Sequence, residues 1–425
     1  MIVITCLTAL LLTLSNFEQQ VINWLKAPVS TNYTCVNDSL FGSLVYPGSR
    51  EGMEHFYSQL DKMLEEEGTV NILHIGGSHV QAGDFSGQMR SNFSRWGENT
   101  IGDRGVIFPF KVLKSNGPYN YYVSYSGKWG KSRCVSSEPD VALGLSGAAA
   151  IAQDANDSIT FDFRGDLRWA FSRIRVIGES SSPDVYPIII SDADTICVFE
   201  KDEQNEGYIF DLGAEKTKFQ IAFKGVSENK NFILRGILPL SSREGITYSE
   251  SGVNGAAVPS WLRCQKFTQD LSLLPPNLVI FGIGINDANV PENEFDAEVF
   301  KADYRSLIRQ IQSINPQCSF LFITNNDCYL NLPRRKRRGK KKTFNKNTEK
   351  VQMAFYDLAK EYNSCVIDVY ALMGGYGSSE KWCKENLMKK DHIHFTQEGY
   401  RLIGDILYNA IVEDYFITRN AGTTL

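Results

Sequence analysis

The feature that most constrains the fold is an apolar run at residues 70–75 that ends in two glycines and a serine. The run has the length and content of a short strand buried in a sheet. Gly76 and Gly77 follow it, and glycine lets the backbone turn sharply there. Ser78 is thereby placed at the carboxyl end of the strand, where open α/β sheets bind their ligands. The simplest alternative role for Ser78 is to cap the next helix.

The order of predicted elements indicates one domain interrupted by another. Apolar residues at helical spacing predict helices over 51–66 and 84–96, on either side of the serine turn. From about residue 105 to about residue 250, short alternating segments predict strands only. Strand and helix then alternate again, with strands predicted at 277–284, 318–324 and 365–370, and helices at 299–311, 351–362 and 397–411.

This pattern predicts an α/β protein with a three-layer α/β/α architecture around a parallel sheet. Residues 51–104 and 250–425 are expected to form it. Residues 105–249 are expected to form an inserted all-β domain, a sandwich or jelly roll. Exposed aromatic side chains in this insertion, such as Tyr119, Tyr121, Tyr122 and Trp129, can stack on sugars, although most such residues belong to a core.

The amino-terminal segment indicates export. Residues 2–14 are apolar and uncharged, too short to span a membrane easily, and match the apolar core of a secretion signal. Residues 1–15 are therefore predicted to be a signal peptide or an N-terminal membrane anchor, followed by a polar arm at 16–50. The net charge of −5 argues against a nucleic-acid partner. The cysteines are widely spaced without a CxxC pair, which favours mostly buried free thiols over a zinc ribbon.

Four short motifs fall where a parallel sheet would bring its loops together: GGSH at 76–79, GVNGA at 252–256, GIGIND at 282–287 and DHIH at 391–394. Their chemistry is complementary. A serine hydroxyl becomes a nucleophile when an imidazole takes its proton, and a carboxylate fixes the imidazole tautomer. His394 and Asp391 can do this for Ser78. The amides of Ser78 and Gly255 and the Asn286 side chain can stabilise the resulting oxyanion.

Together and in this order, the four motifs resemble the SGNH (GDSL) hydrolase family, over residues 70–88, 252–256, 282–289 and 391–400. The resemblance implies Ser78 as nucleophile, His394 as base, Asp391 as its partner, and Gly255 and Asn286 as oxyanion donors. The inserted β domain resembles that of the peptidoglycan O-acetylesterase branch, where a carbohydrate-binding-like module interrupts the hydrolase domain.

The resemblance implies an esterase that needs no cofactor or metal and removes acyl groups, expected to be O-acetyl groups, from an acetylated polysaccharide such as peptidoglycan. It implies a location in the bacterial periplasm or cell envelope, and it makes no prediction of oligomeric state. Polar residues of the same motifs are expected to contact the substrate: His79, Asn254, Asp287 and His392.

One residue departs from the family pattern. Gly77 stands where the family usually has an aspartate that supports the nucleophile turn. From the sequence alone, we expect the substitution Gly77→Asp not to reduce activity. The departure also leaves open an alternative function, that of a non-catalytic glycan-binding protein with a degenerate site.

Two further alternatives remain open at this point. Four of the five histidines lie in the first and last motifs, so His79, His392 and His394 could hold a metal ion with Asp391. That interpretation leaves Ser78 and Asn286 without a role. A basic run at 334–342 is either a solvated loop or an electrostatic clamp for an anionic polymer.

Overall fold

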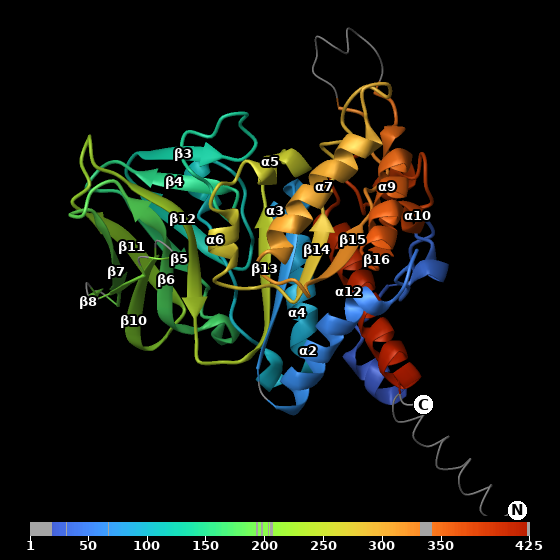
Figure 1. Ribbon diagram of the computed structural model, residues 1–425, viewed down its shortest axis with the longest axis horizontal. Coiled ribbons are helices and arrows are strands. Elements are labelled where there is room, and N and C mark those ends of the chain that lie inside the picture. Colours follow the sequence, from blue (N-terminus) through green and yellow to red (C-terminus); the bar gives the residue numbers. More distant parts are fainter. Residues whose placement is uncertain are drawn as a thin grey trace, which may run out of the picture.

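A five-stranded parallel sheet carries the predicted site (Figure 1). The computed structural model describes residues 19–422, apart from 31, 67, 193, 197, 198, 203, 205, 206 and 332–341. The strands lie in the order β13-β1-β14-β15-β16 and all pair in parallel. Their bounds are Thr69–Gly76 (β1), Gly245–Gly252 (β13), Leu278–Gly282 (β14), Ser319–Ile323 (β15) and Cys365–Ile367 (β16).

Helices cover both faces of this sheet, which confirms the predicted α/β/α architecture. One face packs against α2 (Glu54–Glu65), α4 (Asp84–Phe93) and α12 (Gln397–Gly422). The other packs against α5 (Val258–Leu262), α6 (Phe267–Leu271), α7 (Ala297–Gln312) and α9 (Asn347–Glu361). Successive strand residues point to opposite faces, so Ile72 joins the first core and Leu73 the second. Three further α-helices are short: α3 (Ser78–Gln81), α10 (Val369–Met373) and α11 (Ser379–Lys384).

Two antiparallel sheets form the inserted β domain, on the left of Figure 1. The first has the order β3-β4-β12-β6-β10-β9: Trp129–Arg133, Ala148–Ala152, Phe232–Leu240, Phe171–Ser180, Gly207–Lys216 and Glu200–Asp202. The second has the order β2-β5-β11-β7-β8: Tyr122–Ser126, Ser158–Asp162, Lys218–Lys224, Tyr186–Ser191 and Asp194–Ile196. They enclose a separate core, in which Phe161 and Phe219 stack with ring centroids 5.1 Å apart. The predicted all-β insertion is confirmed.

The structure adjusts several predicted boundaries. The strand predicted at 365–370 ends at Ile367, because the Asp368 side chain accepts the backbone N–H of Ala371 (3.0 Å) and starts α10. The parallel sheet resumes at Gly245, since β13 pairs with β1 from that residue. The final helix continues to Gly422, beyond the predicted residue 411.

The inserted domain is joined to the α/β layers by a buried ion pair. Arg235 of β12 donates to Asp270 of α6 (Nη2–Oδ1 3.1 Å), and both side chains are almost fully buried. Removing one partner of such a pair leaves an uncompensated buried charge, which commonly costs about 3–5 kcal/mol. The pair therefore helps to hold the inserted domain against the α/β layers.

Other sequence predictions concern the ends and the cysteines. The segment 1–15 and all but Lys342 of the basic run lie outside the described residues. Within the described residues, no helix has the length and apolar content needed to cross a membrane. The seven described cysteines are free thiols and six of them are buried, while Cys197 lies outside the description.

Candidate active site

Three neighbouring strands end in glycine at the same level of the sheet. Gly76 is paired with Gly252 on one side and with Gly282 on the other. A Cβ at Gly252 would lie 2.4 Å from the backbone nitrogen of Gln81 in α3, a distance that no side chain tolerates. The glycines therefore allow α3 to pack directly on the strand ends. Ser78, the first residue of α3, is fixed at the carboxyl edge of the sheet.

A hydrogen-bonded series connects Ser78 to the last motif of the chain. The Ser78 Oγ and the His394 Nε2 are 2.8 Å apart. The His394 Nδ1 lies 2.8 Å from the Asp391 Oδ2. The other carboxylate oxygen of Asp391 accepts the backbone N–H groups of Ile393 and His394, each at 2.9 Å. The structure thus brings the predicted nucleophile, base and carboxylate together.

The electrostatics of Asp391 fix the state of the imidazole. Burial opposes ionisation of this carboxyl, but the hydrogen bonds from the His394 side chain and from the two backbone N–H groups outweigh it. They hold the pKa of Asp391 well below its ordinary value. An ionised Asp391 keeps a proton on the His394 Nδ1, so the Nε2 is left as the acceptor for the Ser78 hydroxyl.

The predicted oxyanion donors gather around the same turn. The Asn286 Nδ2 donates to the carbonyl of Ala256 at 2.8 Å, and a primary amide has a second hydrogen to offer. A Cβ at Gly77 would lie only 3.3 Å from this Nδ2 and 3.5 Å from the Ala256 oxygen. Gly255 adopts a left-handed conformation (φ 83°) beside them. The second and third motifs therefore meet next to the nucleophile.

The site opens into a cleft of about 540 Å³ that is rich in amide side chains. Six asparagines line it: Asn116, Asn254, Asn286, Asn289, Asn331 and Asn345. Asn254 donates to the Asn116 Oδ1 (2.7 Å) and to the Ser115 Oγ (3.1 Å), which belong to the segment leading into the inserted domain. Neutral donors and acceptors at this density suit a ligand rich in hydroxyl groups.

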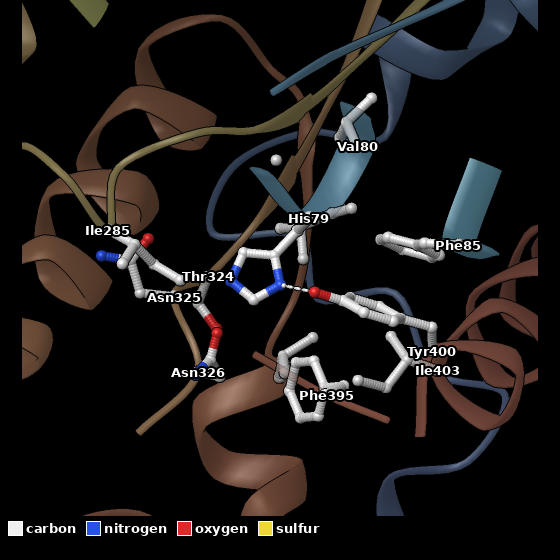
Figure 2. A pocket seen from close by; sticks show the side chains of 13 residues that line it. His79, Val80, Phe85, Ile285, Thr324, Asn325, Asn326, Phe395, Tyr400 and Ile403 are labelled. Carbon is white, nitrogen blue, oxygen red and sulfur yellow. Dashed lines mark hydrogen bonds between the residues drawn. The ribbon is translucent and has the colours of Figure 1, made fainter. Parts of the chain in front are cut away.

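His79 lies behind His394 rather than in the cleft, which differs from the expectation that it contacts substrate. Its Nδ1 is 2.7 Å from the Tyr400 hydroxyl, and its ring centroid is 5.4 Å from that of His394. Burial, followed by the proximity of His394, lowers the pKa of His79 to about 3. Figure 2 shows the His79 ring between Tyr400 on one side and Thr324–Asn326 on the other. These residues line a cavity of about 40 Å³, and the neutral His79 ring forms the wall between it and His394.

Two other predicted substrate contacts also lie outside the cleft. His392 stacks on Tyr329 with ring centroids 4.0 Å apart. Asp287 accepts the backbone N–H of Val258 (3.0 Å) and so caps the N-terminus of α5. Of the four predicted substrate contacts, only Asn254 lines the cleft.

The alternative metal site is not assembled. His392 faces Tyr329, so its ring does not converge with the other predicted ligands. Across the part of the chain that the structure describes, no three His, Cys, Asp or Glu side chains are arranged to hold an ion.

Gln81 contributes to the site and was not predicted. Its Oε1 accepts the backbone N–H of Asn254 (2.6 Å), and its Nε2 donates to the Asn116 carbonyl (2.6 Å). It thereby ties α3 to both walls of the cleft. The available signal was its position two residues after the first motif, within the stretch 70–88 that carries the family resemblance. Asn116 gave no signal, because it belongs to no motif.

We expect the free energy of unfolding to fall as pH rises towards 7, and we expect the substitution Asp287→Asn to remove this fall. Burial raises the pKa of Asp287 to about 7, above its ordinary value of 3.8. The folded state therefore binds a proton that the unfolded chain has lost between about pH 4 and 7, so stability falls as pH rises through this window and levels off above it. Between pH 6 and 8 the free energy of unfolding should fall by on the order of 1 kcal/mol.

Asparagine keeps the oxygen that caps α5, so the variant should not show this decline. Urea unfolding of both proteins at pH 6 and pH 8 measures the difference. Equal declines in the two proteins would contradict the assignment.

A serine, an imidazole and a carboxylate in series are the arrangement that hydrolases with a serine nucleophile use on several unrelated folds. Residues 237–402 match the family model of the GDSL-like lipases and acylhydrolases. This match bears out the resemblance to the GDSL/SGNH hydrolase family that the motifs predict. The matched segment begins within β12 and does not include Ser78, which the geometry alone places in the site.

One solved structure shows the same fold, and others match a part of the chain. A peptidoglycan O-acetylesterase matches with a TM-score of 0.69 and 22% identity, covering 88% of this chain and 99% of that one. An acetyl xylan esterase matches with a TM-score of 0.30 and 19% identity, covering 40% of this chain and 82% of that one. A lipase/acylhydrolase from Enterococcus faecalis matches with a TM-score of 0.30 and 19% identity, covering 40% of this chain and 77% of that one. No curated protein matches the sequence. The first likeness extends over the inserted β domain as well as the α/β layers.

Proposed function

We propose that this protein is an exported serine esterase that removes acyl groups, chiefly O-acetyl groups, from a cell-envelope or other polysaccharide. The observation that carries the proposal is the series Ser78–His394–Asp391 at the base of the amide-lined cleft. The family supports hydrolysis of esters. The open cleft and its asparagines favour a carbohydrate over a long acyl chain.

The geometry supports a two-step reaction. His394 takes the proton of Ser78 as the Oγ attacks the ester carbonyl, and the amides of Ser78, Gly255 and Asn286 stabilise the oxyanion. Collapse breaks the ester bond, and the imidazolium gives its proton to the departing sugar oxygen, which leaves as a hydroxyl. His394 then takes a proton from a water molecule that attacks the acyl-serine, and returns it to the Ser78 Oγ as the acyl–serine bond breaks and the free acid leaves.

Acetate release from a panel of acetylated glycans, including peptidoglycan, tests the proposal. We expect release from at least one acetylated polysaccharide and none from the same glycan after chemical deacetylation. Absence of release from every member, by a folded protein that still binds glycans, would contradict the esterase and favour a binding function.

We expect Asn286→Ala to lower kcat by about 10²–10³-fold, because one preorganised oxyanion donor is lost. KM should change much less, because this donor acts mainly on the charge that develops in the transition state. Kinetics on an activated acetyl ester measure both parameters. Asn286→Asp keeps the side-chain shape but replaces the donor with a negative charge, so it should be at least as damaging. Near-normal kcat in Asn286→Asp would exclude the donor role.

The structure reverses the expectation for Gly77→Asp. A Cβ at this position would press on the Asn286 Nδ2 at 3.3 Å. The carboxylate beyond it would draw the Asn286 amide away from the oxyanion and place a negative charge beside it. We therefore expect kcat to fall by more than tenfold. Gly77→Ala adds the Cβ without the charge and should lose less; equal losses in the two variants would assign the effect to sterics alone.

A further inference from the structure

A second pocket lies at the junction between α4 and the inserted β domain. It has a volume of about 330 Å³ and is lined by residues that include Arg90 from α4, Tyr119, Arg164, Arg168 and Trp169. We call it the junction pocket. The catalytic residues do not line it, and none of the sequence motifs includes its arginines.

Arg90, which lines the junction pocket, belongs to a buried group with an excess of positive charge. Arg90 and Arg104 both donate to Glu250, each Nη2 at 2.5 Å from a carboxylate oxygen. All three side chains are at most 5% exposed. Two guanidinium groups therefore share one carboxylate, and the Arg90 Nη1 is buried with no hydrogen-bond partner among the described residues. A buried positive charge of this kind is costly unless an anion lies close to it.

The rim adds two more arginines. Arg168 forms a two-pronged contact with Asp166 (3.0 and 2.8 Å), whereas the exposed Arg164 side chain has no such contact with a described residue. Arg90 and Arg168 lie near the Trp169 ring, their Cζ atoms 5.9 and 6.0 Å from its centroid. Three arginines thus line the pocket against one lining carboxylate, that of Asp166, while the Glu250 carboxylate behind Arg90 is shared with Arg104. The planar guanidinium group suits paired contacts with a carboxylate.

The junction pocket and the catalytic cleft share one chain segment. Asn116 lines the cleft, and Tyr119, three residues later, lines the junction pocket with 41% of its side chain exposed. Three residues span at most about 11 Å. Between them, Pro118 packs on Gly83, immediately before α4. Because these two lining residues are so close, we take the two sites to be within reach of one oligosaccharide.

We propose that the junction pocket binds the carboxylate of an acidic sugar unit in the same polysaccharide whose ester is cleaved at Ser78. Arg164 and Arg168, backed by the buried charge of Arg90, pair with the carboxylate. The exposed ring of Tyr119 packs against the sugar. The inference rests on the proposed function for its substrate, and it makes the enzyme selective for anionic glycans.

Direct binding tests this proposal independently of hydrolysis. Calorimetry on the full-length Ser78→Ala protein would use three probes of equal length: an oligogalacturonate, an oligosaccharide bearing the lactyl carboxylate of muramic acid, and a neutral galactan oligosaccharide. We expect at least one acidic probe to bind at least tenfold more tightly than the neutral one. The acidic probe that binds identifies the source of the carboxylate.

Introducing Arg164→Gln and Arg168→Gln together into the Ser78→Ala protein should weaken its affinity for the acidic probe at least tenfold. Arg164→Gln alone keeps the Arg168–Asp166 contact and should weaken the affinity for the acidic probe several-fold. This single variant still tests the proposal if the double substitution disturbs folding. Arg309→Gln, exposed on α7 across the sheet, is the matched control and should bind as before. Three results would overturn the proposal: equal affinity for acidic and neutral probes, no binding of any probe, or unchanged affinity in the arginine variants. Because acetate release is measured separately on the unsubstituted enzyme, failure of the esterase is a different result.

Discussion

Replacing Ser78 with alanine is expected to lower the rate of ester hydrolysis by on the order of 10⁶-fold, the loss seen when a serine hydrolase loses its nucleophile. The reaction then loses the covalent step, and only binding and oxyanion stabilisation remain. The hydroxyl's interaction with His394 is the one contact that the substitution removes from the described site. Stability should therefore change little. Acetate release and thermal unfolding measure the two effects.

A double variant provides a control, because the activity losses of residues that act as one catalytic unit do not add. His394→Ala should cost about as much as Ser78→Ala, and the double variant should be no slower than either single one. If Ser78→Ala retained more than a few per cent of the activity while remaining folded, Ser78 would not be the nucleophile. Multiplicative losses in the double variant would mean that the two residues act independently.

Asp391→Asn is expected to lower kcat by about 10⁴-fold. The asparagine can present an N–H to the His394 Nδ1, which then becomes an acceptor and leaves its proton on the Nε2. The imidazole can no longer accept the proton of Ser78. The Asp391 carboxylate instead keeps the proton on the His394 Nδ1, because it stays ionised: its hydrogen bonds hold its pKa well below the ordinary value.

Steady-state kinetics between pH 6 and 9 measure this effect. Asp357→Asn, on the surface of α9, is the matched control and should keep full activity. A loss of less than tenfold in Asp391→Asn would show that His394 is oriented by something other than this carboxylate.

Sequence motifs predicted the centre of the site well because each one follows an element that the pattern of apolar residues locates. Ser78 and Asn286 come just after buried strands, and parallel strands place their carboxyl ends at one edge. Asp391 and His394 are three residues apart, so a single turn brings the two side chains into contact. Local spacing and sheet topology were sufficient for these residues.

The remaining polar residues of the same motifs could not be assigned from spacing. Ser78 and His79 are adjacent, yet the first faces the cleft and the second faces the interior, because the first turn of α3 points them in different directions. Likewise Asn286 lines the cleft, whereas Asp287 turns away to cap α5. Which of two neighbours faces the ligand depends on tertiary packing.

Not every strand of the inserted domain has a sequence that is typical of a strand. The segment Ala148–Ala152 consists almost entirely of alanines, which have low strand propensity, yet it forms β4 between two other strands. The junction pocket is likewise invisible in the sequence. Arg90 and Arg164 are 74 positions apart and meet only because the inserted domain folds back on α4.

The central claim is that His394 activates Ser78 as a nucleophile, and covalent labelling with a fluorophosphonate tests it most directly. Peptide mass mapping of the inactivated enzyme should find one adduct, on Ser78, and the His394→Ala variant should label at least a thousandfold more slowly. An active enzyme that loses its activity to the reagent while Ser78 remains unmodified, or equal labelling rates in the two proteins, would contradict the account.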